Sequence, residues 1–402
     1  MTTETVDVIA GIDTHAETHH LAVITTTGAR LADRSFPASV QGYGDLLAFV
    51  VTLGRIIAIG VEGTGSYGAG IARFLRKAGI TVHEVIRPGG QVRRLRGKSD
   101  PIDAYAAAHA VLAGHDLPTP KDADGEVEAI RVLTVARRSA IKARSAAATQ
   151  IKSLLVTAPD ALRARFRGLS NDDLHAKLAA QSPAQATDTV EVATLASMRH
   201  LARRHHALTR EITDLDSDLD ALVTSTAPAL RAAYGVGPVT AAPLLITAGD
   251  NPDRLTSEGA FAALCGTAPI PASSGKTTRY RLNPGGDRQA NAALHQIVLV
   301  RMAHDPRTKA YVAKRTAQGK SEKEIMRCLK RAVAREVYHL IVHPQPVPRT
   351  DDLRPLRHAK GMTLRTVAEQ FNVWPARISD IERGKRRDDD FASTYRQWLL
   401  AA

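Results

Sequence analysis

The sequence predicts an α/β domain, followed by a long α-helical hairpin or coiled coil, a mainly α segment and a small all-α domain. Residues 1–118 alternate β-branched apolar runs with helical ones, residues 119–228 are rich in Ala, Leu and Arg and poor in Gly, and prolines crowd residues 343–350. The alternation is typical of an α/β layer, and a proline-broken stretch is typical of a linker. The two remaining parts are residues 229–342 and 351–402.

In the first domain, four short runs have the composition of strands: residues 6–12, 21–26, 56–61 and 82–86. Residues 43–53 and 70–78 have the apolar spacing of helices. The order of the two kinds of run predicts a mixed sheet with helices packed on it.

Four carboxylates stand at informative places in this domain. Asp13 and Glu62 each end a β-type run, and Asp100 and Asp103 are three residues apart, so that on a helix they lie on one face. Like charges held together repel unless a cation or a proton neutralises them. An all-oxygen cluster suits Mg²⁺ or Mn²⁺, the cations of phosphodiester chemistry, and we expect the four side chains to bind such a metal.

The charge of the chain favours a polyanionic partner. The net charge is +13, and residues 276–335 contain 15 Lys or Arg against 4 Asp or Glu. A second basic run leads directly to Asp100 and consists of Arg87, Arg93, Arg94, Arg96 and Lys98. Basic runs are often no more than solvated faces, but their nearness to the carboxylates favours nucleic acid.

The cysteines and the hydropathy indicate a cytoplasmic protein. Cys265 and Cys328 are far apart and form neither a disulfide framework nor a zinc site. No signal peptide opens the chain, and no apolar run is long enough to cross a bilayer, so we expect no membrane partner. The pairs His19–His20 and His205–His206 are predicted to lie at the surface, because adjacent side chains point to different faces.

The helical part carries an approximate heptad. Its apolar positions are Leu201, Leu208, Ile212, Leu215, Leu219 and Leu222. The polar composition of residues 170–189 predicts a break between two helical arms. An antiparallel hairpin, an intersubunit coiled coil and a plain helical spacer all fit this pattern.

The third part opens on a glycine-rich turn and contains a serine loop. Gly235 and Gly237 precede a helix-starting proline, which resembles a helix-hairpin-helix turn that presents N–H groups to a phosphate; a plain connecting turn is the alternative. Ser273, Ser274, Gly275 and Lys276 form a polar loop with a cation at hand, although most such runs are simple exposed turns.

The last part has the spacing of a helix-turn-helix. Residues 361–371 predict a helix, Asn372 suits a left-handed turn, and a second helix from Pro375 buries Ile378 and Ile381. The run from Ile378 to Gly384 resembles the Cro/C1-type (XRE) DNA-binding family. Leu364 and Trp374 depart from that family, which has a glutamine and a polar cap there. The side chains expected to contact DNA are those of Arg365, Arg377 and Ser379.

Residues 5–342 resemble the transposases of insertion sequence family one hundred and ten, relatives of the Piv DNA invertases. The motifs that carry the resemblance are Gly-Ile-Asp-Thr at 11–14, Val-Glu-Gly-Thr-Gly-Ser-Tyr at 61–67, Lys-Ser-Asp-Pro-Ile-Asp-Ala at 98–104, Gly-Val-Gly-Pro-Val-Thr-Ala at 235–241, and Gly-Thr-Ala-Pro-Ile-Pro-Ala-Ser-Ser-Gly-Lys at 266–276. Their joint order makes the match specific. The C-terminal helix-turn-helix departs from the family, whose members usually end near the basic helices.

The resemblance implies a RuvC-like, RNase H-type first domain with Asp13, Glu62, Asp100 and Asp103 as its acidic tetrad. It also implies a transposase domain that supplies a nucleophilic serine, Ser274 by alignment, with Ser273 as the second choice. Family members form dimers and tetramers, and a noncoding RNA guides them to donor and target DNA. A phosphoserine intermediate conserves bond energy, so no nucleotide cofactor is expected. The cations expected to hold phosphates around the loop are Lys276, Arg279, Arg281 and Arg288.

Two other functions fit the same residues. A RuvC-like Holliday junction or structure-specific endonuclease would use the four carboxylates and water, without a serine. A DNA-binding regulator with an inactive nuclease fold would need no metal.

Overall fold

The computed structural model of the chain describes residues 6–85, 99–114, 117–182, 188–276, 280–281, 283–384 and 388–401. The chain divides into two compact units, Met1–Ala129 with Ala248–Thr256, and Ile130–Thr247 with Ser257–Ala402. The basic run from Arg87 to Lys98 and the side chain of Arg279 lie outside the described residues.

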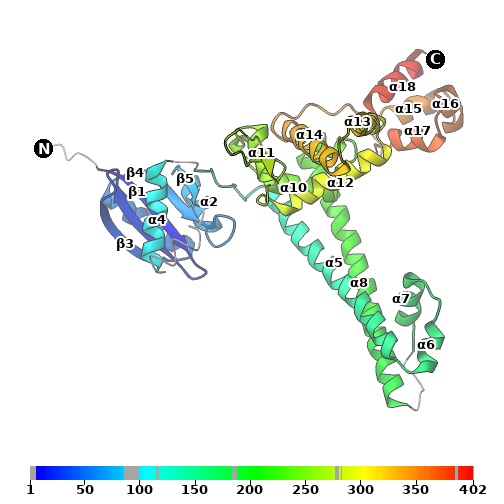
Figure 1. Cartoon of the computed structure of the whole chain (residues 1–402), viewed down its shortest axis with the longest axis horizontal. Coiled ribbons are helices and arrows are strands. Elements are labelled where there is room, and N and C mark those ends of the chain that lie inside the picture. The colour runs from blue at the N-terminus through cyan, green and yellow to red at the C-terminus, as the bar shows by residue number, and fades with distance from the viewer. Residues whose placement is uncertain are drawn as a thin grey trace. The chain divides into compact units, whose positions relative to one another are not determined.

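The first unit is built on a five-stranded mixed sheet in the order β3-β2-β1-β4-β5 (Figure 1). The strands are β1 (Asp7–Thr14), β2 (Thr18–Thr25), β3 (Arg30–Pro37), β4 (Arg55–Glu62) and β5 (Val82–Val85). The first three are antiparallel neighbours, whereas β4 runs parallel to β1, and β5 parallel to β4. The predicted mixed sheet is therefore confirmed. The edge strand β3 was not predicted, because Phe36 is its only buried residue.

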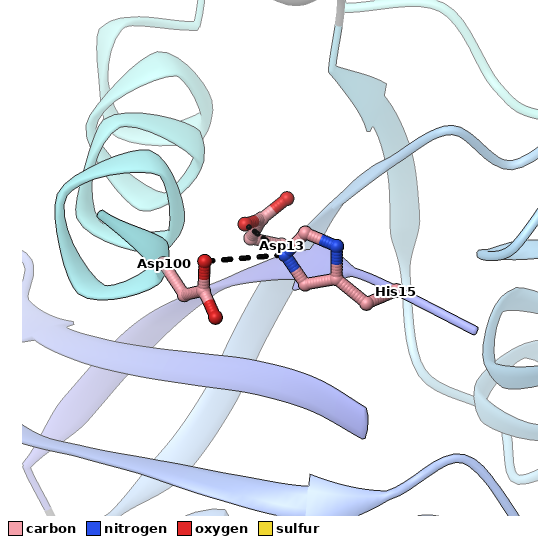
Figure 2. Close-up of side chains that lie close together, drawn as sticks. All are labelled: Asp13, His15 and Asp100. Carbon is pink, nitrogen blue, oxygen red and sulfur yellow. Dashed lines mark hydrogen bonds and ion pairs between the residues drawn. The ribbon is translucent and has the colours of Figure 1, made fainter. Parts of the chain in front are cut away.

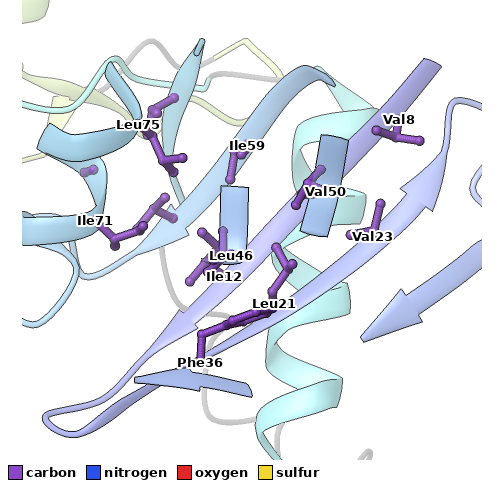
Figure 3. Packing of buried hydrophobic residues seen from close by; sticks show 14 residues of the cluster. Val8, Ile12, Leu21, Val23, Phe36, Leu46, Val50, Ile59, Ile71 and Leu75 are labelled. Atoms are coloured by element: carbon purple, nitrogen blue, oxygen red, sulfur yellow. The ribbon is translucent and has the colours of Figure 1, made fainter. Parts of the chain in front are cut away.

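Helices cover both faces of the sheet. On one face, α1 (Val40–Leu53) and α2 (Ala69–Lys77) pack on a cluster that includes Val8, Ile12 and Leu46 (Figure 3). On the other, α4 (Asp100–Ala113) packs through Ala104, Ala107 and Ala108. Since strand side chains alternate between faces, successive residues of β1 join the two clusters in turn.

This double cover contradicts the surface placement expected of His19 and His20. Both imidazoles are buried on β2, on opposite faces of the sheet. His19 stacks on Tyr43 of α1 with ring centroids 5.5 Å apart. His20 contacts Ser35 Oγ at 2.8 Å and Asp33 Oδ1 at 3.0 Å. Adjacent residues do point to different faces, but here both side chains are buried against neighbouring residues.

In the second unit, two long helices run side by side in opposite directions (Figure 1). They are α5 (Glu126–Thr157) and α8 (Thr189–Thr226), and α6 (Asp160–Phe166) and α7 (Asn171–Ala179) lie between them in the chain. An Arg137–Asp216 ion pair joins the long helices at one point, and Ile151 shares a core with Met198 at another. The antiparallel hairpin is thus observed. The break predicted over 170–189 is wrong in its first half, which forms α7.

Short helices and one small hairpin make up the next part. The elements are α9 (Pro228–Ala232), α10 (Pro238–Ala248), η1 (Pro252–Arg254, within the first unit), α11 (Glu258–Leu264), β6 (Ile270–Pro271), β7 (Tyr280–Arg281), α12 (Arg288–His304), α13 (Pro306–Ala317) and α14 (Glu322–Val342). Both cysteines are free thiols, as expected. Among the described helices, none is long and apolar enough to span a bilayer.

Four helices close the chain around a core of their own. They are α15 (Leu353–Ala359), α16 (Leu364–Gln370), α17 (Pro375–Glu382) and α18 (Asp389–Ala401). Ile378 and Ile381 are buried in this core, as the sequence predicted, and Val367 is buried with them. Asn372 has the expected left-handed backbone, with φ of 50°, between α16 and α17.

Candidate metal centre

Three side chains meet at one edge of the sheet. Asp13 lies at the end of β1, His15 follows that strand, and Asp100 is the first residue of α4 (Figure 2). The His15 Nε2 atom is 3.1 Å from Asp13 Oδ2 and 3.2 Å from Asp100 Oδ1. The ligand atoms of all three residues lie within 4.8 Å of one another. Asp13 is buried, whereas His15 and Asp100 are partly exposed, so the cluster is open to solvent on one side.

The sheet topology brings Glu62 to the same edge. Because β1 and β4 are parallel, with Ile12 opposite Val61, their carboxyl ends coincide. Asp13 and Glu62 each follow the residue whose side chain joins the α1 face, so both belong to the α4 face. Thr14 Oγ1 donates to the Glu62 carbonyl oxygen at 3.0 Å, and this bond ties the two strand ends together. The Glu62 side chain is fully buried.

Small residues let α4 approach the sheet closely. A Cβ atom at Gly11 would lie 2.2 Å from the Ala104 carbonyl oxygen and 2.2 Å from the Ala108 nitrogen. A Cβ at Gly60 would lie 2.9 Å from the Ala107 oxygen. Only glycine at these strand positions leaves room for the helix backbone. The glycines of β1 and β4 thereby set the position of the carboxylates on α4.

The first turn of α4 carries two of the predicted acidic residues. Pro101 suits a helix start, and Asp100 and Asp103 both lie in the first turn, where the helix dipole favours negative charge. Asp103 is buried and Asp100 is not. The structure therefore joins Asp13 and Asp100 through His15, and places Glu62 and Asp103 buried on the same face of the sheet.

His15 is the member of the cluster that the sequence reasoning did not assign. A lone histidine two residues after Asp13 has no spacing that identifies a metal site, and Asp100 is 85 residues away in the chain. The donor set of carboxylate oxygens with one imidazole nitrogen fits a divalent cation such as Mg²⁺ or Mn²⁺, and the nitrogen is more favourable for Mn²⁺. A cation there would offset the repulsion between the carboxylates.

The serine loop belongs to the second unit. Ser273 and Ser274 are exposed between β6 and β7, and Gly275 has a left-handed backbone with φ of 56°. Lys276 and Arg281 are also exposed, as is Arg288 at the start of α12. These side chains are accessible to a large ligand.

The cations of residues 276–335 include side chains held in ion pairs within the fold and side chains exposed to solvent. Several of these side chains hold the fold: Arg301 donates to Glu336 at 2.6 and 2.9 Å, and Arg335 lies 2.8 Å from Glu258. The exposed cations of α13 and α14 are Arg307, Lys309, Lys314, Lys323 and Arg327, together with Arg335, which is exposed as well as paired. The total charge of this segment therefore overstates the surface available to a polyanion.

At the glycine turn, Gly235 has φ of 76°, and the Gly237 N–H donates to Thr240 Oγ1 at 3.0 Å. That N–H is engaged within the turn between α9 and α10. The sequence suggested that this N–H would bind a phosphate, but in the structure it already donates to the Thr240 hydroxyl.

The C-terminal basic side chains are also paired. Arg377 was expected to point outward, but its guanidinium donates to Asp388 at 2.6 Å and lies over the Phe391 ring. Arg365 is exposed and donates to Glu369 at 3.1 Å. Ser379 is half-buried on α17. Trp374, before α17, is the most exposed large apolar side chain of the described residues.

Two family models match the chain. A DEDD-type transposase model of IS110 elements matches residues 10–158, which contain Asp13, His15 and Asp100. A model described as the transposase IS116/IS110/IS902 family matches residues 227–313, which contain the serine loop. Together they cover more than half of the chain. The chain belongs to the IS110 family of transposases.

Relatives of this IS110-family transposase come from other insertion elements. A candidate mini-circle transposase for IS117 of Streptomyces coelicolor is 26% identical over 326 residues, 68% of this chain and 79% of the relative. The 42 kDa protein of insertion element IS900 of Mycobacterium paratuberculosis is 26% identical over 393 residues, 83% of this chain and 97% of the relative. The 43.6 kDa protein of IS110 of Streptomyces coelicolor is 26% identical over 380 residues, 81% of this chain and 91% of the relative. As a transposase, the chain acts on DNA.

Proposed function

We propose that this transposase cuts and rejoins DNA strands with a serine nucleophile assisted by a divalent metal. In this proposal, residues 1–118 form a RuvC-like, RNase H-like catalytic domain, and residues 229–342 supply the serine. The observation that carries it is the meeting of Asp13, His15 and Asp100 at the edge that also bears Glu62 and Asp103. That arrangement suits a cation beside a scissile phosphate.

The acidic residues would hold Mg²⁺ or Mn²⁺. When bound, the metal would lower the pKa of a coordinated hydroxyl and stabilise charge on the phosphorus centre. Asp13 and Asp100 would bind and orient it, His15 would contribute a nitrogen, and the buried Glu62 and Asp103 would complete the acidic tetrad. A serine hydroxyl is a weak nucleophile without such help.

The reaction would then proceed in two balanced steps. Ser274 Oγ bonds to phosphorus, the ester bond to one DNA strand breaks, and the departing oxygen takes a proton. A hydroxyl of the new strand next attacks the phosphoserine, restores the DNA ester and returns the proton to Ser274. Since one phosphoester replaces another, no nucleotide cofactor is needed.

The serine and the acidic residues belong to different compact units, so the proposal requires them to meet on DNA. We propose that a dimer or tetramer assembles a composite site, held by the α5–α8 hairpin. Cleavage would then require the assembled dimer or tetramer. The exposed cations around the loop, Lys276, Arg281 and Arg288, would bind the phosphates of donor and target DNA.

Guidance by a noncoding RNA is part of the proposal. Exposed cations on α13 and α14 suit RNA as well as DNA, because phosphate contacts carry no sequence information. Digestion of copurified RNA before the assay should abolish recombination, and element-derived RNA should restore it.

Adduct trapping tests the chemistry. Suicide DNA of the element ends, Mg²⁺ and the full chain should give a covalent protein–DNA species, absent in Ser274→Ala and strongly reduced in Asp13→Ala. Ser273→Ala is the matched control, since it removes the neighbouring hydroxyl, and should keep the adduct. If the adduct is lost in Ser273→Ala but kept in Ser274→Ala, the nucleophile is Ser273.

The same assay separates the alternatives. Cleavage without any adduct, retained in Ser274→Ala, would replace this proposal with a RuvC-like structure-specific endonuclease. DNA binding without cleavage, whichever divalent metal is added, would indicate a DNA-binding regulator instead of a transposase with this chemistry.

A further inference from the structure

A pair of histidines lies in contact within the helical arm. His175 of α7 and His205 of α8 have ring centroids 4.2 Å apart and ring planes inclined by 44°. His206 follows on α8, with its ring centroid 6.1 Å from that of His205. The helices α7 and α8 pack directly on each other (Figure 1). None of these residues belongs to the transposition chemistry proposed above.

Three of the four ring nitrogens of this pair are buried without hydrogen-bond partners among the described residues. His175 is 4% exposed, and among the described residues neither its Nδ1 nor its Nε2 atom has a partner; His205 Nδ1 is in the same condition. A neutral imidazole carries one N–H donor and one nitrogen acceptor, whichever tautomer it adopts. Buried polar atoms in native proteins normally have partners, and an orphaned one often marks a water or an ion.

The surroundings favour the neutral form of both imidazoles. Burial is the main cause that lowers the pKa of His175, and the neighbouring His206 and Lys152 lower it further. Burial also lowers the pKa of His205, followed by the charges of His175, Arg144 and His206. The Asp172 carboxylate, in the first turn of α7, opposes this for both. Neutral imidazole is the form that binds metals, so no proton has to leave first.

We propose that His175 and His205 bind a transition-metal ion of the Zn²⁺ class. Imidazole nitrogen suits Zn²⁺, Co²⁺ and Ni²⁺ and does not suit Mg²⁺, so this site differs in chemistry from the carboxylate centre. The two imidazoles supply the protein ligands, and water can fill what remains of a four-coordinate shell.

The metal would fasten the α6–α7 segment to the long helix. These helices are otherwise held by an apolar cluster that includes Leu162, Leu174 and Leu195. A bound ion adds a polar link at the His175–His205 contact and gives the buried nitrogens their partner. Its role is structural, and it sets the shape of the arm that the proposed assembly would use.

Cobalt absorption tests the site on the full chain. Co²⁺ added to the metal-free protein should give the visible bands of an imidazole-bound ion at one equivalent. His175→Phe and His205→Phe keep a buried ring but remove the nitrogens, and each should weaken the binding that produces these bands about 100-fold or more. His200→Ala removes an exposed histidine of the same helix and should leave the bands unchanged. Asp13→Ala should also leave them unchanged.

Hydrogen exchange gives an independent readout. Zn²⁺ should slow amide exchange across α7 in the wild-type chain and in His200→Ala, but not in His175→Phe, whose circular dichroism should match the wild type. The proposal is overturned if wild type produces no such bands, or if they survive equally in His175→Phe.

Discussion

A buried ion pair holds the C-terminal helices together. Arg357 donates to Glu382 at 2.7 and 3.0 Å, and the Tyr395 hydroxyl donates to the same carboxylate at 2.9 Å. Both charged side chains are almost fully buried. Glu382 raises the pKa of Arg357, and burial raises that of Tyr395, so the guanidinium stays charged and the phenol neutral. Removal of one partner would leave a charge without compensation.

We therefore expect Glu382→Ala to destabilise these helices by about 3–5 kcal/mol, the range for breaking a buried pair. The chain contains two tryptophans, Trp374 and Trp398, both in this part, so their fluorescence reports its unfolding in urea without truncation. Glu369→Ala removes an exposed partner of Arg365 and should cost less than about 1 kcal/mol. Equal urea midpoints for Glu382→Ala and Glu369→Ala would show that the buried ion pair does not stabilise these helices more than the exposed one.

The sequence predicts which carboxylates belong to the site, but it does not predict which other side chains contact them. Asp13 and Glu62 end β-type runs, which is a local pattern, and the strand ends do coincide. His15 contacts Asp13 two residues away and also Asp100, which is distant in the chain, and no local pattern encodes the contact with Asp100. Likewise, the sequence predicts that Arg377 contacts DNA, because its partner Asp388 lies beyond α17, just before α18, and no local pattern indicates that ion pair.

At the scale of elements, the prediction from sequence is wrong where a polar stretch forms a helix. Ser170 begins the predicted break, yet its hydroxyl accepts from the Asp173 N–H and caps α7. The same Ser-Asn-Asp composition favours both loops and helix starts, and only the leucines that follow decide between them. β3 was missed for a related reason, since an edge strand needs few buried side chains.

The packing of α4 on β1 gives a prediction at this scale. Gly11→Ala would place a Cβ 2.2 Å from backbone atoms of α4, so the helix must move away, at a cost of about 1–3 kcal/mol. Asp100 and Asp103 would move with it. We expect Mn²⁺ affinity, measured by calorimetry, to fall about tenfold or more.

Gly44→Ala is the matched control, because a Cβ there has no atom within 4 Å and the residue lies inside α1. That variant should keep the metal affinity and gain about 0.5–1 kcal/mol of stability. Unchanged Mn²⁺ binding in Gly11→Ala would show that the helix position does not set the metal centre.

At the scale of the whole molecule, charge and core are distributed unevenly. The C-terminal helices have their own apolar core, and residues 349–402 hold 11 Lys or Arg against 8 Asp or Glu. Their removal would leave +10 of the net charge of +13. Most of the attraction to phosphate therefore belongs to the part of the chain that matches the transposase models, and the added helices contribute little to it.

We propose that these added helices, which resemble the XRE type, recognise a specific site at the element ends or its promoter. A chain ending at Pro348 should then keep the salt-dependent affinity for random DNA but lose the protected footprint on element DNA. Ser379→Ala, which changes one α17 side chain and no net charge, should weaken the footprint with the same salt slope. Footprinting at several salt concentrations measures both the salt-dependent affinity for DNA and the protection of the specific site. If the shortened chain protects, recombines and represses like the full chain, the added helices do not select DNA, and the target is chosen elsewhere in the protein or by its RNA.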